Sequence, residues 1–153
     1  MGTVDIVTKE YMRENAIFAD AFNYLIYGGK KVIDPAGLTE IDTATSAVGK
    51  KDALQKYRDV LKAAVIKQDE KMSYVLLGIE NQTDVHYAMP VRNAIYDALQ
   101  YGRQVADIAA GHRRNKKDFT GKSNGEYLSG FLKEDCIKPV ITLVIHFGAE
   151  EWD

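Results

Sequence analysis

The sequence predicts an α/β domain in which helices pack against a central sheet. Two observations favour this class. Helical patterns and short runs of β-branched and aliphatic residues follow one another as helix, strand, strand, strand, helix, loop and strand, with the first strand the weakest signal. The chain of 153 residues, of which 46% are hydrophobic, is also long enough for one domain with a buried core.

The first helix is expected in "NAIFADAFNYLIYGG" (15–29), where apolar residues recur at steps of three and four positions. Gly28 should end it, because glycine adopts the left-handed conformation at little cost. The next stretch, "KKVIDP" (30–35), is predicted to be one short strand closed by Pro35. Residues 37–53 are small, polar and weakly patterned, which favours a loop.

Two apolar runs then predict a hairpin. They cover Lys56–Lys67 and Lys71–Gln82, and a short polar segment from Gln68 to Lys71 joins them. Strands joined so closely are expected to pair antiparallel.

A long helix is predicted from Pro90 to Ala110, since proline is well tolerated in a first helical turn. One apolar stripe runs along it: Val91, Ile95, Ala98, Leu99, Val105 and Ile108. The segment 112–138 reads as irregular and polar. The final run, "PVITLVIHFG", is almost continuously apolar, which is typical of a strand covered on both faces.

Composition limits the partners and the compartment. The net charge of -2 means that nucleic acid could be attracted only by a local basic patch. Cys136 is the sole cysteine, so we expect no disulfide and read it as a small core residue. No apolar run reaches the length of a signal peptide or a membrane span, which predicts a cytoplasmic protein without a membrane partner.

The hairpin is predicted to bring two acidic residues together. Glu80 and Gln82 point to the same side of their strand, and Asp59 comes from the neighbouring strand. Such an oxygen-rich site suits Mg²⁺, although acids at strand ends are also often only solvated. If the two carboxylates are crowded, removing one should leave stability unchanged or raise it slightly.

The stretches "YRDVLKAAVI" and "SYVLLGIENQTDVHYAMPVRNAIYDALQY" resemble the Rpn family of recombination-promoting, transposase-like nucleases in the PD-(D/E)XK superfamily. The shared features are an Arg-Asp pair opening a strand, a strand ending in Glu-x-Gln, and Met-Pro-x-Arg-x-x-x-Tyr opening a helix. Trp152, after an apolar strand and a glycine, also fits. The resemblance covers 15–153 and is most specific over 58–101.

The resemblance implies a single nuclease-like domain over 1–153 with a restriction endonuclease-like core, a mixed sheet flanked by helices. It leaves open whether this is the N-terminal part of a longer chain. Asp59 and Glu80 match the two motif acids and would bind Mg²⁺ or Mn²⁺. Gln82 stands where the superfamily motif has lysine; it cannot supply a positive charge, but it can orient a water or a phosphate oxygen.

Three more positions would lie near such a site by the same resemblance. Arg92 is expected to hold a phosphate, with a surface ion pair as the alternative. Tyr96 shares its helix face and also reads as a core residue with a satisfied hydroxyl. Asp20 corresponds to an extra acid on the first helix, and it reads equally as a solvated helix residue.

A basic run follows the long helix. Its charged residues are candidates for contact with the DNA backbone, or for a solvated loop surface: Arg113, Arg114, Lys116 and Lys117.

The predicted function is that of a metal-dependent DNA endonuclease linked to recombination or mobile DNA. The alternatives are a catalytically inactive DNA-binding or scaffolding relative of such a nuclease, and a protein-interaction domain. The oligomeric state stays open, with a homodimer as one option.

Overall fold

The computed structural model describes residues 3–41, 44–46, 55–57, 59–68 and 71–152. Within them lie four α-helices and a short 3-10 turn, η1 at Pro35–Gly37. The helices are α1 (Thr3–Arg13), α2 (Asn15–Leu25), α3 (Met89–Arg114) and α4 (Asn124–Ser129). None of these helices is long and apolar enough to cross a membrane.

The predicted α/β class is confirmed, with a mixed sheet at its centre. Six strands lie in the described part of the chain: β1 (Thr39–Glu40), β2 (Ala44–Ser46), β3 (Gln55–Tyr57), β4 (Val60–Gln68), β5 (Lys71–Gln82) and β6 (Val140–His146). Four of them form one sheet in the order β1-β4-β5-β6, whereas β2 and β3 form a separate pair. β4 pairs antiparallel with β1 and β5, and β6 runs parallel to β5.

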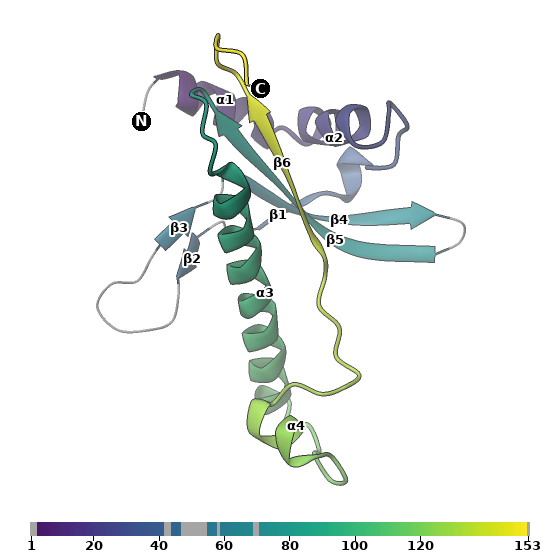
Figure 1. Ribbon diagram of the computed structural model, residues 1–153. Helices are drawn as coiled ribbons and strands as arrows, with labels where there is room; N and C mark the ends of the chain where they lie inside the picture. Colours follow the sequence, from purple (N-terminus) through teal and green to yellow (C-terminus); the bar gives the residue numbers. More distant parts are fainter. Residues whose placement is uncertain (1–2, 42–43, 47–54, 58, 69–70, 153) are drawn as a thin grey trace.

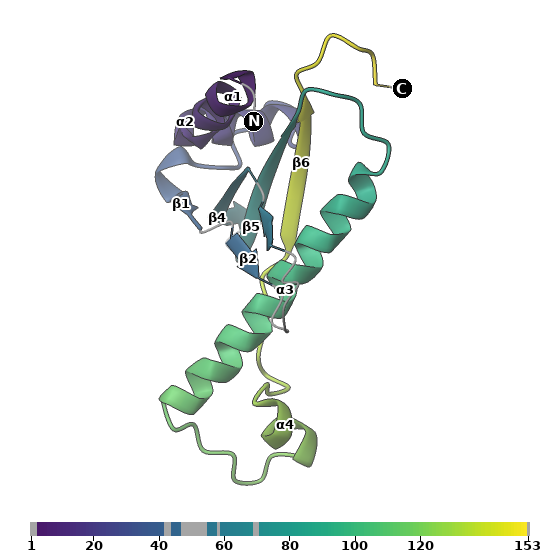
Figure 2. The ribbon, with the colours of Figure 1, turned by 90° about the vertical axis from the view of Figure 1, so that its left-hand side faces the viewer.

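The sheet lies between two helical layers (Figures 1 and 2). α1 and α2 cover one face, and the long α3 crosses the other face. α4 lies beyond the sheet, beside the far end of α3. The main core forms between α2 and the sheet, where Phe18 and Phe22 pack with Val60, Leu77 and Ile79.

The predicted hairpin is confirmed. β4 and β5 pair from Val60↔Ile79 to Gln68↔Lys71 without a break. The strand expected from Lys56 is divided, however. Its first residues belong to β3, which pairs with β2, and β4 begins only at Val60.

The strand predicted at 30–35 is wrong. The buried side chain of Asn23, on α2, accepts hydrogen bonds from the backbone N–H groups of Val32 and Ile33 and donates one to the carbonyl of Ile33. These bonds satisfy backbone groups that would otherwise need a partner strand. The segment therefore follows α2 as an extended loop, after a turn in which Gly28 has the expected positive φ of 60°.

α1 was not expected from the sequence. It joins α2 through a sharp corner at which the fully buried Lys62 of β4 donates hydrogen bonds to the carbonyl of Arg13 and the side chain of Asn15. A cation at the last turn of a helix complements its dipole. Burial lowers the pKa of Lys62 despite the nearby acids Glu40 and Glu14.

α3 confirms the predicted helix and continues four residues further, to Arg114. Its orientation differs from the prediction, because Val91, Ile95 and Val105 of the expected core stripe are exposed. The face turned to the sheet is instead partly polar. Asp97 accepts a hydrogen bond from Thr142 of β6, and the Tyr101 hydroxyl accepts one from the backbone of Val140.

β6 is an edge strand that contacts both helical layers. Ile141, Leu143 and Ile145 pack against the core, and Thr142 faces α3. The strand is therefore covered on both faces, as predicted, but each of its residues remains half-buried. Cys136, expected in the core, is exposed in the segment before β6.

Candidate functional site

The two predicted motif acids lie at the same end of the β4–β5 hairpin. Asp59 directly precedes β4, and Glu80 follows Ile79, the register partner of Val60. Side chains alternate along a strand, so Glu80 points away from the core face of Ile79 and toward α3. Glu80 is 2% exposed, and Asp59 is half-buried.

Asp59 is oriented by the neighbouring strand. Its Oδ2 accepts a hydrogen bond of 2.8 Å from the backbone N–H of Asn81, the residue after Glu80. A carboxylate fixed in this way presents its other oxygen in a defined direction. The sequence carried no signal for this bond, because it depends on the register of the hairpin.

Arg92, on the first turns of α3, joins the same site. Its Nη2 lies 2.9 Å from Glu80 Oε1, and its Nε donates a hydrogen bond of 2.9 Å to the hydroxyl of Tyr96. Tyr96 is buried with a satisfied hydroxyl, which was one of its two expected roles. Arg92 makes an ion pair with a buried acid instead of the surface pair that was considered.

The electrostatics follow from these contacts. Burial acts to lower the pKa of Arg92, but the hydrogen bond with Tyr96 and the charges of Glu80 and Asp59 outweigh it, so that the pKa is raised. The guanidinium of Arg92 thus offsets the negative charge of Asp59 and Glu80 (the acid pair). The expectation that removing one carboxylate leaves stability unchanged stays a prediction for Asp59. For Glu80 we expect a loss of stability instead, because its removal takes away the ion-pair partner of Arg92.

Gln82 lies on the same strand face as Glu80, two residues further on. In the sheet it is the register partner of His146, and its backbone carbonyl accepts a hydrogen bond from Phe147. Lys62 cannot replace the lysine that the superfamily motif has at Gln82, because Lys62 points to the α2 side of the sheet, over the ring of Phe18.

Asp20 is not brought to the acid pair. It is exposed on α2, whose buried residues pack on the opposite face of the sheet from Glu80. It lines a separate surface pocket with Asp34 and Lys31. This position agrees with the solvated alternative considered for Asp20.

The two carboxylates of Asp59 and Glu80 suit a hard divalent cation as a partial set of ligands. Among the described residues, no group of three or more His, Cys, Asp or Glu side chains is placed to hold a metal. Asp59 and Glu80 supply two carboxylates, and Mg²⁺ in enzymes that act on phosphates often has only one or two, completed by water and substrate oxygens. The pair would serve as such a partial ligand set.

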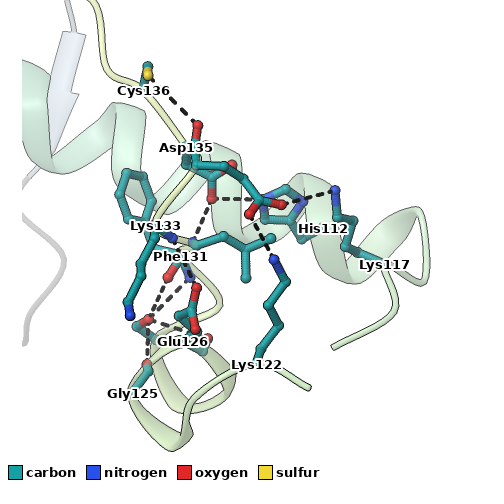
Figure 3. Close-up of polar contacts among 12 residues, drawn as sticks. His112, Lys117, Lys122, Gly125, Glu126, Phe131, Lys133, Asp135 and Cys136 are labelled. Carbon is teal, nitrogen blue, oxygen red and sulfur yellow. Dashed lines mark hydrogen bonds and ion pairs between the residues drawn. The ribbon is translucent and has the colours of Figure 1, made fainter. Parts of the chain in front are cut away.

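The basic run lies at the opposite end of α3. Its first half forms the last helical turn, not a loop, since α3 ends at Arg114. Figure 3 shows the acidic partners nearby: His112 Nε2 lies 2.8 Å from Asp135 Oδ2. Lys117 Nζ lies 3.8 Å from Glu134 Oε1. Arg113, Arg114 and Lys116 are exposed.

The two predicted DNA-contacting regions are far apart. At about 1.5 Å of rise per residue, Arg113 lies roughly 32 Å along the helix from Arg92. This is close to one turn of B-form DNA, about 34 Å. A single duplex would therefore have to extend along most of α3 to reach both regions.

A pocket that the sequence did not predict lies beside the acid pair. It has a volume of about 480 Å³ and is lined by residues from the loop before α3, its first turns, β6 and the segment after β6. Its walls include Tyr87, Asn93, Val144, His146 and Trp152. Val144 and His146 are the register partners of Glu80 and Gln82, which places the pocket next to the predicted site.

Comparison of the chain with protein-family models, with curated proteins and with solved structures finds no match.

Proposed function

We propose that the chain is a metal-dependent DNA endonuclease domain, with a restriction endonuclease-like core, linked to recombination or mobile DNA. The main support is that hairpin pairing brings Asp59 and Glu80 to one end of two adjacent strands, with Arg92 of α3 beside them. The mixed sheet flanked by helices is compatible with the core that the resemblance implies.

In this proposal Asp59 and Glu80 hold Mg²⁺ or Mn²⁺. When bound, such a cation supplies a nucleophile at neutral pH and offsets the charge of a phosphodiester. The bond from the Asn81 backbone keeps Asp59 directed, which reduces the freedom that the carboxylate would lose on binding.

In the proposal Arg92 holds a phosphate of the DNA, and Gln82 positions a phosphate oxygen and a water. The planar guanidinium of Arg92 can bind two phosphate oxygens at once, and its bond with Tyr96 limits its rotamers. Gln82 can donate to a phosphate oxygen and accept from a water. Because Gln82 carries no charge, Arg92 would provide the positive charge that the motif lysine supplies elsewhere in the superfamily.

A catalytically inactive DNA-binding domain is the second candidate. One observation favours it: Arg92 forms an ion pair with Glu80 at 2.9 Å, so a cation would have to compete with the guanidinium for that carboxylate. In this case the fold would persist while cleavage is lost.

A cleavage assay separates the two. Supercoiled plasmid and labelled duplexes are incubated with Mg²⁺ or Mn²⁺, and with EDTA as the metal-free reference. We expect cleavage by the native chain, and a loss of roughly 10²-fold or more in Asp59→Asn and in Glu80→Gln, because each removes a cation ligand. Asp107→Asn, a change at a 74% exposed carboxylate on α3, is the matched control and should cut normally.

Either of two results would reject the proposed nuclease activity. If purified, folded chain gives no metal-dependent product, or if Asp59→Asn cuts as fast as the native chain, the proposal fails. Retained DNA binding without any cleavage would select the inactive candidate.

A further inference from the structure

The outer face of α3 carries a stripe of exposed, uncharged residues, which we call the α3 seam. Its members follow one another at alternating steps of four and three positions: Val91, Ile95, Ala98, Gly102 and Val105. They lie on the side of the helix opposite Tyr96 and Gln100, which are buried toward the sheet. Val91 is 63% exposed and Ile95 44%. A strict repeat of three and four is the pattern of a helix that packs against a second helix.

The chain itself covers the next position of this face. Ala109 follows Val105 by four residues and is 4% exposed. Gly130, which ends α4, packs over it, since a Cβ at Gly130 would lie 3.2 Å from the Cβ of Ala109. Figure 2 shows α4 on the side of α3 opposite the sheet. The outer face of α3 is therefore already a packing face at one end, and the α3 seam continues it.

The middle of the α3 seam allows a close approach. Gly102 lies within a helix of 26 residues, where glycine is less favourable than alanine. Apart from the neighbouring turns of α3, no atom of the described residues lies within 4 Å of the position that a Cβ would take at Gly102. The small side chain of Ala98 beside it leaves further room. A second helix could thus come near the backbone here while it contacts Ile95 and Val105 on either side.

The two ends of α3 differ in charge. Residues 80–92 and 147–152, which meet at its first turn, contain four acids and one arginine, and Asp84 and Glu150 are exposed. Residues 112–138, at its far end, contain seven lysines and arginines and four acids. Two α3 helices side by side in opposite directions therefore bring unlike charges together, whereas the same direction brings like charges together. The same direction would also set the two α4 segments against each other.

We propose that the α3 seam is the surface through which two copies of the chain dimerise, with their α3 helices antiparallel and a two-fold axis near Gln100. In this register Ile95 meets Val105 of the second copy, and Ala98 meets its Gly102. Large residues thus pair at both ends and small residues at the centre, as a self-complementary interface requires. One helix face buries less surface than a standard interface, so we expect a dissociation constant of about 1–100 µM.

Sedimentation velocity over a series of chain concentrations tests the surface. The native chain should change from monomer to dimer between about 1 and 500 µM. Ala98→Lys should weaken the dimer by about tenfold or more, because the ammonium would be buried in the interface. Since lysine is a good helix former and Ala98 is exposed, the unfolding midpoint should not change. Tyr24→Lys is the matched control; it puts a lysine at a 72% exposed position on the opposite helical layer and should dimerise normally.

NMR on a mixture of two chains tests the direction. Both chains carry Cys136→Ser, which removes the sole native cysteine. One chain also has Lys116→Cys with a spin label, and the other is labelled with nitrogen-15. In the antiparallel dimer, residue 116 of one copy lies level with residue 84 of the other. The amide signals of residues 84–91 in the second chain should therefore broaden most.

Three results would overturn the proposal, and none of them depends on whether the chain cuts DNA. A chain that stays monomeric at about 500 µM does not pair through the α3 seam. If Ala98→Lys dimerises as the native chain does, the interface lies elsewhere. Broadening centred on residues 113–117 of the second chain would show that the two helices run in the same direction.

Discussion

Glu80 is the residue on which the local chemistry depends most. Its carboxylate is 2% exposed and lies 2.9 Å from the guanidinium of Arg92, whose side chain is 38% exposed. A buried ion pair contributes little net stability when intact, but removing one member leaves the other charge buried without compensation. Arg92 therefore stabilises the metal-free site, in addition to any contact with DNA.

Arg92→Ala is expected to lower the free energy of unfolding by about 1–3 kcal/mol. This is less than the roughly 3–5 kcal/mol typical of fully buried pairs, because Arg92 is partly exposed to solvent. Urea unfolding of the metal-free protein measures the change. Arg103→Ala is a well-matched control, since Arg103 is 39% exposed and faces the 74% exposed Asp107 at 3.9 Å. The free energy of unfolding should fall clearly more in Arg92→Ala than in Arg103→Ala. Equal losses would show that the Arg92–Glu80 ion pair contributes no more to stability than an exposed pair does.

Gln82→Lys tests the proposed nuclease site at the position where the motif of the resembled superfamily has lysine. The change adds a positive charge on the strand face of Glu80, where a phosphate would lie. We expect cleavage to rise by about tenfold or more, since one well-placed donor to a transition state can contribute roughly 10²–10³-fold. The measurement is the single-turnover rate at saturating Mg²⁺. A fall in rate with unchanged DNA affinity would instead show that the ammonium displaces the cation.

At the scale of the elements, the helices and the hairpin with strong local patterns were predicted correctly. α2 follows from apolar spacing and α3 from the proline in its first turn, both of which are properties of adjacent residues. The segment 112–138, expected to be irregular, contains α4, which was missed although its capping box of Ser123 and Glu126 is a local pattern. Two other failures have non-local causes. Residues 30–35 resemble a strand, but Asn23 satisfies their backbone from α2. The apolar stripe of α3 is real, yet the helix turns a different face to the sheet.

α4 gives a prediction for acid pH. It begins with a capping box in which the carboxylate of Glu126 accepts hydrogen bonds from Ser123, while it also accepts one from the backbone N–H of Lys133. The bonds from Lys133 and Ser123 lower the pKa of Glu126 to about 2. Because the folded state binds its proton less readily than the unfolded chain, this stabilisation is complete above about pH 4.5 and is lost as the pH falls toward 2.

Amide hydrogen exchange across α4, compared at neutral pH and near pH 2, measures this effect. The Lys133 and Ser123 amides should lose protection at acid pH in the native chain. In Glu126→Gln their protection should be low at both values. An acid-insensitive α4 in the native chain would contradict the assigned role of Glu126.

At the scale of the whole molecule, Arg92 beside the acid pair and Arg113 at the exposed basic end of α3 lie roughly 32 Å apart along the helix. If both regions contact one duplex, the length of that duplex decides whether the basic end of α3 contributes to DNA binding. Each phosphate contact releases counterions, which gives a slope of about -0.9 in log K against log salt for B-form DNA.

Joint neutralisation of Arg113, Arg114 and Lys116 to alanine is expected to weaken binding of a duplex of about 20 base pairs for all sequences alike. It should reduce the salt slope by about 2–3, one contact for each residue. A duplex of about six base pairs, too short to span the distance, should bind both proteins equally. Lys30→Ala with Lys31→Ala, which neutralises exposed cations beside α2, serves as the control. An equal loss on both duplexes would place the basic end and the acid pair on separate DNA segments.

The residues of the candidate site could be predicted from the sequence better than their arrangement in space. The hairpin fixed Asp59 and Glu80 through one short connection, so counting residues from the turn was enough. The pairing of Gln82 with His146 and the position of Trp152 depend on how β6 returns from beyond α4 to lie parallel to β5. Such long-range pairing leaves no local pattern, and the neighbouring pocket therefore could not be predicted.

The central claim is that Asp59 and Glu80 bind a divalent cation, and Mn²⁺ titration followed by NMR tests it most directly. Mn²⁺ at less than one equivalent broadens the amide signals nearest to its binding site. The amides of Glu80 and Asn81, which border the Asp59 carboxylate, should broaden first, and Asp59→Asn should abolish the effect. Broadening that begins elsewhere, such as at Glu134 and Asp135, or that persists unchanged in Asp59→Asn, would contradict the account.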